Sequence, residues 1–333
     1  MRRHLPAIAI LCAPIIAAAN PSIPDIIDTH ILPRFDTLDQ MSQALSDAAM
    51  KDCDPNSNDL REAYNVAFDA WLSASHLRFG PTEVDDRAYA LAFWPDSRGK
   101  TPRILSSLIA DEDPIGLDSS TYADVSIAGR GFYAMEFLLY DNRLEQSGTY
   151  HCALIQTVAA DIAAMSSAIH VDWRDSHVNV LMSPAPDAPY RSEEEVLQEL
   201  LRALTAGLQF TQDSRLGRPL GTFDRPRPMR SEAHRSGRSS RHVMLSLLAL
   251  RDLSSRLAAS DNALSAKLEH RFEIAIAKLA KLNDPVFSGV ADPQSRLRIE
   301  VVSQAIGNIR STIQTELGPT LGVAAGFNSL DGD

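Results

Sequence analysis

The stretch SEEEVLQELLRALTAGL, residues 192–208, shows the pattern that decides the fold. Its leucines recur three or four residues apart and therefore share one face of an α-helix, at Leu197, Leu200, Leu201, Leu204 and Leu208. Ser192 and the three glutamates that follow it are typical of a helix start, where free backbone N–H groups favour oxygen acceptors and negative charge. We therefore expect an amphipathic helix that buries its leucine face.

The same period recurs along most of the 333 residues, whereas sustained alternation typical of strands is lacking. We expect further helices over residues 27–49, 58–79, 101–110, 131–140, 151–169, 236–259, 262–281 and 294–317, with Pro33 kinking or interrupting the first. The pattern predicts an all-α protein. A loop rich in Pro and Asp, residues 183–189, is the best boundary between an N-terminal bundle (20–186) and a C-terminal bundle (187–333). A single interleaved domain is the alternative.

The first residues have the pattern of an export signal. Met1-Arg2-Arg3-His4 is basic, an apolar run follows, and small residues close the segment at Ala17-Ala18-Ala19. This is the pattern of a secretory signal peptide, residues 1–19, with cleavage near Ala19 and a periplasmic product. Leu11 precedes Cys12 where a lipid-attachment signal needs a small residue, so lipidation is not favoured. We expect no other stretch long enough to span a membrane.

After cleavage the chain keeps two cysteines, Cys53 and Cys152. An even pair in an oxidising compartment predicts a disulfide, and two separate buried thiols are the alternative.

The composition and missing motifs exclude several classes of function. The net charge of −11 disfavours nucleic acid as a partner, because phosphate backbones require clustered Lys and Arg. The sequence has no His-Glu-x-x-His, P-loop, dinucleotide fingerprint or Gly-x-Ser-x-Gly. His170 and His177, near two aspartates, are a minor candidate for a metal site.

The apolar segment from Gly131 to Tyr140 contains one carboxylate, Glu136, on the same helix face as Tyr133. A charge in such surroundings needs a cation, a metal or several hydrogen-bond donors. A structural pair with an arginine and a role as metal or substrate ligand both stay open.

Six arginines lie between residues 225 and 241 and offer that cation. We expect Glu136 to contact Tyr133 and one of these arginines, with Arg235 the first choice. The arginines could equally make ion pairs between the bundles or bind an anion at the helix start near Ser236. Phe93-Trp94-Pro95-Asp96 reads as a buried anchor that fixes a loop.

Together these segments resemble the imelysin family of exported bacterial proteins. The resemblance rests on Arg78-Phe79-Gly80-Pro81, Phe93-Trp94-Pro95-Asp96, Gly131 to Leu139, Arg235-Ser236-Gly237-Arg238-Ser239 and the tail Gly322 to Asp333. It implies two four-helix-bundle-like domains and a periplasmic protein linked to iron uptake or regulation, in a family classed with metallopeptidases.

The family motif is Gly-x-His-x-x-Glu, and here Tyr133 stands where the histidine belongs, between Gly131 and Glu136. A phenol of pKa about 10 is a much poorer metal ligand than imidazole. The first hypothesis is therefore a non-catalytic binding or accessory protein in iron or metal handling. Its partner would be a small ligand, a metal or an envelope protein, held in a cleft lined by Gly131, Tyr133, Glu136, Trp94, Asp96, Glu232, Arg235 and Ser236.

The second hypothesis is a metallopeptidase in which Glu136 acts as general base. This hypothesis implies a divalent metal or iron as cofactor, with metal ligands outside the motif. Glu136 is also a candidate metal ligand in its own right.

Overall fold

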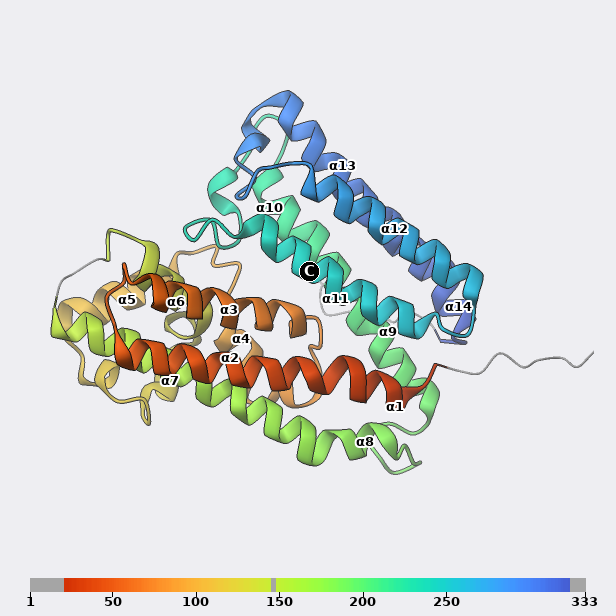
Figure 1. The fold of residues 1–333 in the computed structure, drawn as a ribbon, viewed down its shortest axis with the longest axis horizontal. Coiled ribbons are helices and arrows are strands. Elements are labelled where there is room, and N and C mark those ends of the chain that lie inside the picture. Colours follow the sequence, from red (N-terminus) through yellow and green to blue (C-terminus); the bar gives the residue numbers. More distant parts are fainter. Residues whose placement is uncertain (1–20, 145–147, 324–333) are drawn as a thin grey trace, which may run out of the picture.

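The computed structural model describes residues 21–144 and 148–323, and the regular elements in these ranges are all helices (Figure 1). Within the described residues, the one β-bridge joins Thr222 and Arg225. The expected all-α class is confirmed. The predicted signal peptide and most of the tail used for the family resemblance lie outside the described residues.

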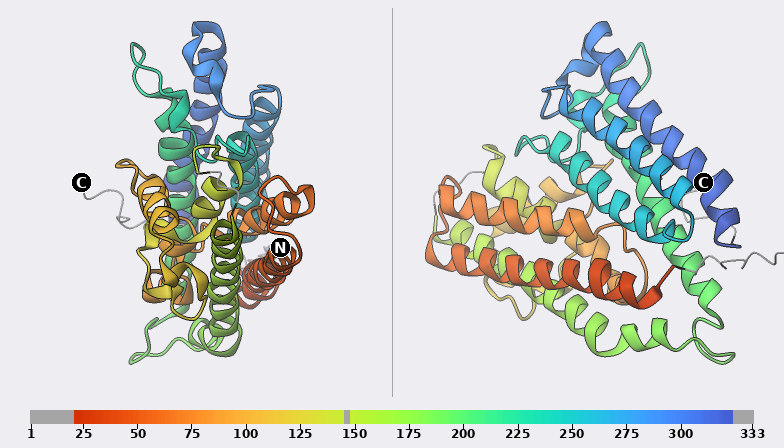
Figure 2. Two further views of the ribbon diagram at one scale, coloured as in Figure 1. Left: turned by 90° about the vertical axis from the view of Figure 1, so that its left-hand side faces the viewer. Right: turned by 45° about the vertical axis from the view of Figure 1, so that its right-hand side comes forward.

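Three long helices form one side of the molecule, two of them consecutive and the third from later in the chain. Helices α2 (Leu32–Lys51), α3 (Asn58–Ala74) and α7 (Thr149–Asp172) lie side by side (Figures 1 and 2). The chain enters α2 through α1 (Ile23–Ile26) and a π-helical turn, Ile27–Ile31, which ends two residues before Pro33. Proline has no N–H and its ring crowds the carbonyl four residues earlier, so the wider turn accommodates it where a regular α-helix would not.

The helix that begins at Thr149 runs further than the sequence suggested. It continues through a π-helical turn, Trp173–His177, into α8 (Val178–Met182), instead of ending near Ile169. The Trp173 ring is fully buried and packs against Phe35 and Phe79, each at 5.2 Å between ring centroids. This contact anchors the extension to the core.

The same helix corrects an expectation about membranes. Thr149–Met182 is long and apolar enough to cross a bilayer by length and composition, and 61% of its most apolar window is buried inside the protein. The expectation that no such stretch exists beyond the signal peptide is therefore wrong. Contact with α2 and α6 accounts for the apolar surface of a core helix, so the lack of a spanning segment stays a prediction.

Three shorter helices pack against this layer or against one another: α4 (Arg87–Leu91), α5 (Lys100–Asp111) and α6 (Gly131–Tyr140). Two 3₁₀ turns, Gly80–Thr82 and Val84–Asp86, precede α4, and three more lie between α5 and α6, at Pro114–Leu117, Tyr122–Asp124 and Ile127–Gly129. Every residue of α6 from Gly131 to Leu139 is buried, as its continuous apolar sequence requires. Gly131 has a φ of +72°, and a Cβ there would lie 2.1 Å from the carbonyl oxygen of Ala90. Only glycine lets α6 begin against α4.

The remaining helices lie obliquely to the first group (Figures 1 and 2). They are α9 (Glu193–Gln209), a π-helical segment (Phe210–Leu216), α10 (Gly217–Leu220), α11 (Ser239–Leu257), α12 (Asn262–Ala280), α13 (Pro293–Thr312), a second π-helical turn (Ile313–Leu317) and α14 (Gly318–Thr320). Two further 3₁₀ turns span Pro228–Arg230 and Ser288–Ala291. Helix α11 packs against both α9 and α3.

One continuous hydrophobic core extends through both groups of helices. The chain passes from the first group to the second through residues 183–192, which form a loop as expected. The division into domains 20–186 and 187–333 stays a prediction.

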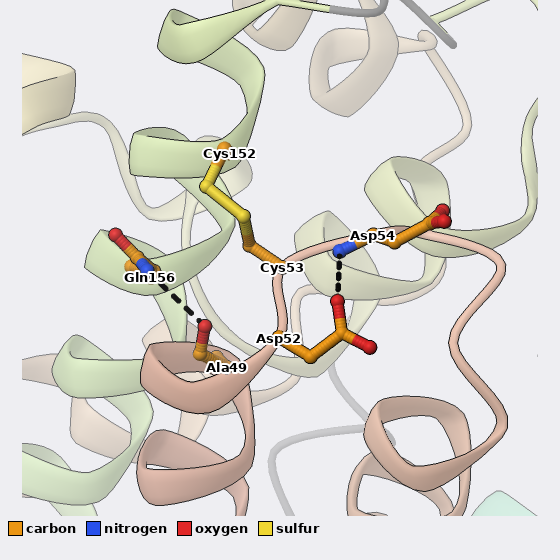
Figure 3. Close-up of a disulfide and its surroundings, with 6 residues drawn as sticks. All are labelled: Ala49, Asp52, Cys53, Asp54, Cys152 and Gln156. Carbon is orange, nitrogen blue, oxygen red and sulfur yellow. Dashed lines mark hydrogen bonds between the residues drawn. A yellow bond between two sulfur atoms is a disulfide. The ribbon is translucent and has the colours of Figure 1, made fainter.

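Cys53 and Cys152 form a disulfide, as the sequence predicted (Figure 3). The bridge joins the residue after the C-cap of α2 to the first turn of α7 and closes a loop with a sequence separation of 99. Beside it, Gln156 Nε2 donates to the Ala49 carbonyl at 3.2 Å. The bridge therefore locks two helices that already pack together.

Removing this bridge should destabilise the fold through the unfolded chain. For a loop of this length the chain-entropy model assigns about 4–5 kcal/mol. We expect the Cys53→Ser, Cys152→Ser double variant to lose an amount of this order in urea unfolding. Reductant should lower the stability of the wild type and leave the double variant unchanged. Insensitivity of the wild type to reductant would contradict the bridge.

Candidate functional site

Helix α6 meets the segment 231–237 through two separate hydrogen-bonded contacts. The Tyr133 hydroxyl donates to Glu232 Oε1 at 2.5 Å. One turn along α6, Glu136 Oε1 accepts from the Ser236 backbone N–H at 3.0 Å and from the Ser236 hydroxyl at 2.8 Å. The two motif side chains thus face the same segment but hold different partners.

The expected pairing of Glu136 with Tyr133 and Arg235 is wrong. Arg235 Nε donates instead to Asp141 Oδ2 at 2.9 Å, and its guanidinium lies 3.7 Å from the centre of the Phe137 ring. Hydrogen bonds from Arg143 and Arg235 hold the pKa of Asp141 well below its usual range. The Ser236 donors satisfy Glu136 locally, so the long arginine side chain is free to reach the carboxylate just beyond the end of α6.

Glu232 is the most strongly held charge of the site. It is 2% exposed, and its Oε2 lies 2.7 Å from Arg215 Nε and 3.1 Å from His242 Nδ1. Burial alone would raise the pKa of Glu232, but the Arg215 charge, His242 and the Tyr133 hydrogen bond outweigh it and lower the pKa to about 2. Glu232 is therefore an anion whose surroundings already neutralise it.

Tyr133 acts as a hydrogen-bond donor in this arrangement. Burial, and then the neighbouring Glu232 charge, raise the pKa of the Tyr133 phenol well above its usual value. Its ring packs edge-on against Phe68, with centroids 5.3 Å apart, and stacks with Trp94 at 6.5 Å. A phenol held protonated and pointed at a carboxylate lacks the oxyanion that a metal would require.

The residues around Glu136 do not fit a metal centre. Within residues 21–144 and 148–323, no group of three or more His, Cys, Asp or Glu side chains is placed to hold a metal ion. Glu136 is 1% exposed and already accepts two hydrogen bonds on one oxygen. His170 does not join His177 in a site: its Nδ1 pairs with Asp39 at 3.0 Å, whereas the His177 ring packs against Trp173.

A cavity of about 690 Å³ lies beside the Tyr133–Glu232 contact, between the first group of helices and α9 and α11. This volume is within the usual range for a small-molecule site. Aromatic side chains form much of its wall: Trp71, Phe79, Tyr89, Trp94, Tyr133, Tyr190 and Phe210. Its volume and its aromatic wall make this cavity a candidate ligand site.

The sequence-predicted residues divide into three sets. Trp94, Tyr133 and Glu232 line the cavity. Gly131, Glu136, Arg235 and Ser236 are not among its lining residues, and they form or support the packing of α6 instead. Asp96 lies elsewhere, because its carboxylate accepts from the Thr101 backbone N–H at 2.8 Å at the start of α5.

The arginine-rich segment chiefly makes ion pairs between the two groups of helices. Arg238 and Arg241 both pair with Asp69 on α3, and Arg235 pairs with Asp141. Arg225, Arg227 and Arg230 are exposed. The ion-pair alternative therefore describes the helix-facing half of the segment.

Several lining residues were missed by sequence reasoning. Arg215 and Phe210 enter the cavity from the π-helical segment Phe210–Leu216, and His76 enters from the loop after α3. A widened helical turn often marks a functional site, but it leaves no periodic signature in the sequence. His242 was visible only as one scattered histidine beside the arginines.

The Glu232 cluster makes stability depend on pH. At about pH 7, Glu232→Gln should lower the unfolding free energy by about 3–5 kcal/mol, because Arg215 is left as an uncompensated buried charge. A carboxyl with a lowered native pKa stabilises the fold above its unfolded pKa, and this stabilisation is lost as pH falls from 4.5 to about 2. The difference in unfolding free energy between the variant and the wild type, measured by urea unfolding, should therefore become smaller as pH falls through this range.

Glu83→Gln is the matched control, because Glu83 pairs with Arg78 on the same cavity but both side chains are about one-third exposed. Such a pair should contribute at most about 1 kcal/mol. A Glu232→Gln effect that is equally small, or independent of pH, would contradict the electrostatic role of Glu232.

Comparisons with known proteins agree with this architecture. The family model for imelysin, peptidase family M75, matches residues 31–313. Iron-regulated protein A of Synechococcus elongatus is 21% identical over 330 residues, covering 90% of this chain and 86% of the relative.

Two crystal structures share the fold. An imelysin-like protein from Psychrobacter arcticum 273-4 has a TM-score of 0.78 and 21% identity over 91% of this chain and 95% of its own. A putative iron-regulated protein A precursor from Parabacteroides distasonis has a TM-score of 0.74 and 12% identity over 89% and 95%. With the family model covering most of its length, this chain belongs to the imelysin family.

Proposed function

We propose that this chain is an exported, non-catalytic binding protein of iron handling that takes a small organic ligand in its aromatic cavity. The observation that carries this proposal is the cavity of about 690 Å³ beside a motif whose polar groups are already paired within the protein. The link to iron comes from relatives named as iron-regulated proteins.

Export is part of the proposal. The pattern of residues 1–19 supports cleavage near Ala19 and a periplasmic product, and the Cys53–Cys152 bridge suits an oxidising compartment. A small ligand or an envelope protein is the expected partner, and the net charge of −11 speaks against nucleic acid.

The alternative is a metallopeptidase that uses Glu136 as general base, and the peptidase description of the family model favours it. A general base must come within hydrogen-bond distance of the proton that it removes. Glu136 is 1% exposed, holds the Ser236 N–H and hydroxyl, and does not line the cavity. This placement supports a structural role for Glu136.

Binding can be followed by intrinsic fluorescence, because two of the three tryptophans, Trp71 and Trp94, line the cavity. Tris(maltolato)iron(III) and tris(tropolonato)iron(III), two uncharged ring chelates, are suitable iron-bearing probes, because the charged side chains that line the cavity already pair with one another. We expect saturable quenching by at least one of them. In Trp94→Ala, where Trp71 still reports binding, the affinity for that probe should be about tenfold lower, because a stacking surface is lost. Phe223→Ala, an exposed residue outside the cavity, is the control and should bind as the wild type does. No quenching by either probe would remove the iron link.

A cleavage assay separates the two functions. The mature chain should not cleave insulin or casein, with or without added zinc or iron, and chelator should make no difference. Glu136→Gln should bind the iron probes as the wild type does, because its amide oxygen can still accept from Ser236. Chelator-sensitive cleavage that a folded Glu136→Gln variant lacks would establish the peptidase instead.

A further inference from the structure

Three side chains far apart in the sequence form a hydrogen-bonded chain that ends at the cavity. His30 Nδ1 lies 2.7 Å from Asp252 Oδ2, and His30 Nε2 lies 2.8 Å from His76 Nε2. Asp252 is on α11 and is about one-third exposed, whereas His30 is fully buried. His76 is 5% exposed and lines the cavity.

This series of hydrogen bonds determines which ring nitrogens of His30 and His76 carry a proton. Although burial acts to raise it, the hydrogen bonds from His30 and Arg256 and the Arg256 charge hold the pKa of Asp252 below its usual range, so this carboxylate accepts the His30 Nδ1–H. Burial lowers the pKa of His30 to about 4 and that of His76 well below its usual value, so both rings are neutral near pH 7. The lone pair on His30 Nε2 then accepts the His76 Nε2–H, and His76 Nδ1 carries a lone pair.

No described residue donates a hydrogen bond to that lone pair, and a second buried polar group nearby also lacks a hydrogen-bond partner. His76 Nδ1 and Ser246 Oγ are both buried without a hydrogen-bond partner. Both residues line the cavity through other atoms, and a small rotation of each side chain would bring its polar atom to the cavity surface. Ser246 lies one helical turn before Leu250, and Leu250 and His76 both approach Gly207 closely. A buried polar atom without a partner costs about 1–3 kcal/mol, which a ligand that supplies the missing hydrogen bond recovers.

The charged side chains that line the cavity already form ion pairs with one another. Its three arginines pair with its three glutamates, as Arg78–Glu83, Arg202–Glu199 and Arg215–Glu232. No charge of either sign is therefore left over for a ligand, whereas the aromatic wall offers stacking surface.

From this geometry we infer that the cavity binds a hydroxylated aromatic molecule without net charge, whose O–H donates to His76 Nδ1 and whose second polar group contacts Ser246 Oγ. Asp252 and His30 act as positioning residues, because they hold His76 in the tautomer that accepts. This inference rests on the proposed function in taking the cavity as the ligand site.

Isothermal titration with catechol in iron-free buffer tests it. Catechol should bind, and its dimethyl ether, which has the same ring but no donor, should bind at least about tenfold more weakly. Benzoate, an anion of similar size, should bind as weakly as the ether. Equal affinity for catechol and its ether, or preference for benzoate, would overturn the inference.

Ser246→Ala should weaken catechol binding about tenfold. Ser254→Ala is the matched control, because Ser254 is also buried on α11 with an unpartnered hydroxyl but does not line the cavity. Equal affinities of the two serine variants would contradict the site. His76→Phe should abolish the preference for catechol over its ether. If that variant does not fold, the serine pair and the ligand pair still decide.

The outcomes separate this inference from the proposed function. Catechol binding that depends on Ser246, without quenching by either iron probe, keeps the inference and removes the iron link. Quenching by an iron probe that is unchanged in Ser246→Ala keeps the proposed function and removes the inference.

Discussion

The buried carboxylate of Glu232 is the constraint around which the contact between the two groups of helices is built. An ionised carboxylate in the interior is tolerated only where opposite charge and donors surround it. Its partners come from three elements: Tyr133 from α6, Arg215 from the π-helical segment and His242 from α11. Satisfying one charge therefore fixes the mutual positions of elements far apart in the chain and sets one wall of the cavity.

Tyrosine in place of the motif histidine changes what the rest of the motif does. Gly131 still lets α6 start against the backbone of α4, so the local geometry is retained. The Tyr133 hydroxyl, however, reaches across to Glu232, and Glu136 turns to the donors of Ser236. A pair that could have shared one ligand becomes two independent hydrogen-bonded contacts, which hold helix to helix.

Local periodicity predicted most helices, because burial of one face is a property of each segment alone. The all-α class and the disulfide followed from patterns readable in sequence, and three of the residues that the sequence proposed for a cleft, Trp94, Tyr133 and Glu232, line the cavity. Arg215 and His76 were not, because only tertiary packing brings them there. The error over Arg235 has a similar cause: six arginines compete for several carboxylates, and the chain alone does not reveal that Ser236 satisfies Glu136 first.

The cavity lies where the two groups of helices contact each other. Ligand binding in it therefore depends on how the two groups are placed relative to one another. On one side Tyr133 and Arg215 meet at Glu232, and on the other His30 links Asp252 of α11 to His76 beyond α3. A ligand that completes the hydrogen bonding of His76 and Ser246 contacts both groups at once. Because it binds only when they are correctly placed, its binding free energy adds to the stability of that placement. The unpartnered groups of the cavity thus make the empty protein less stable at the contact that a ligand would complete.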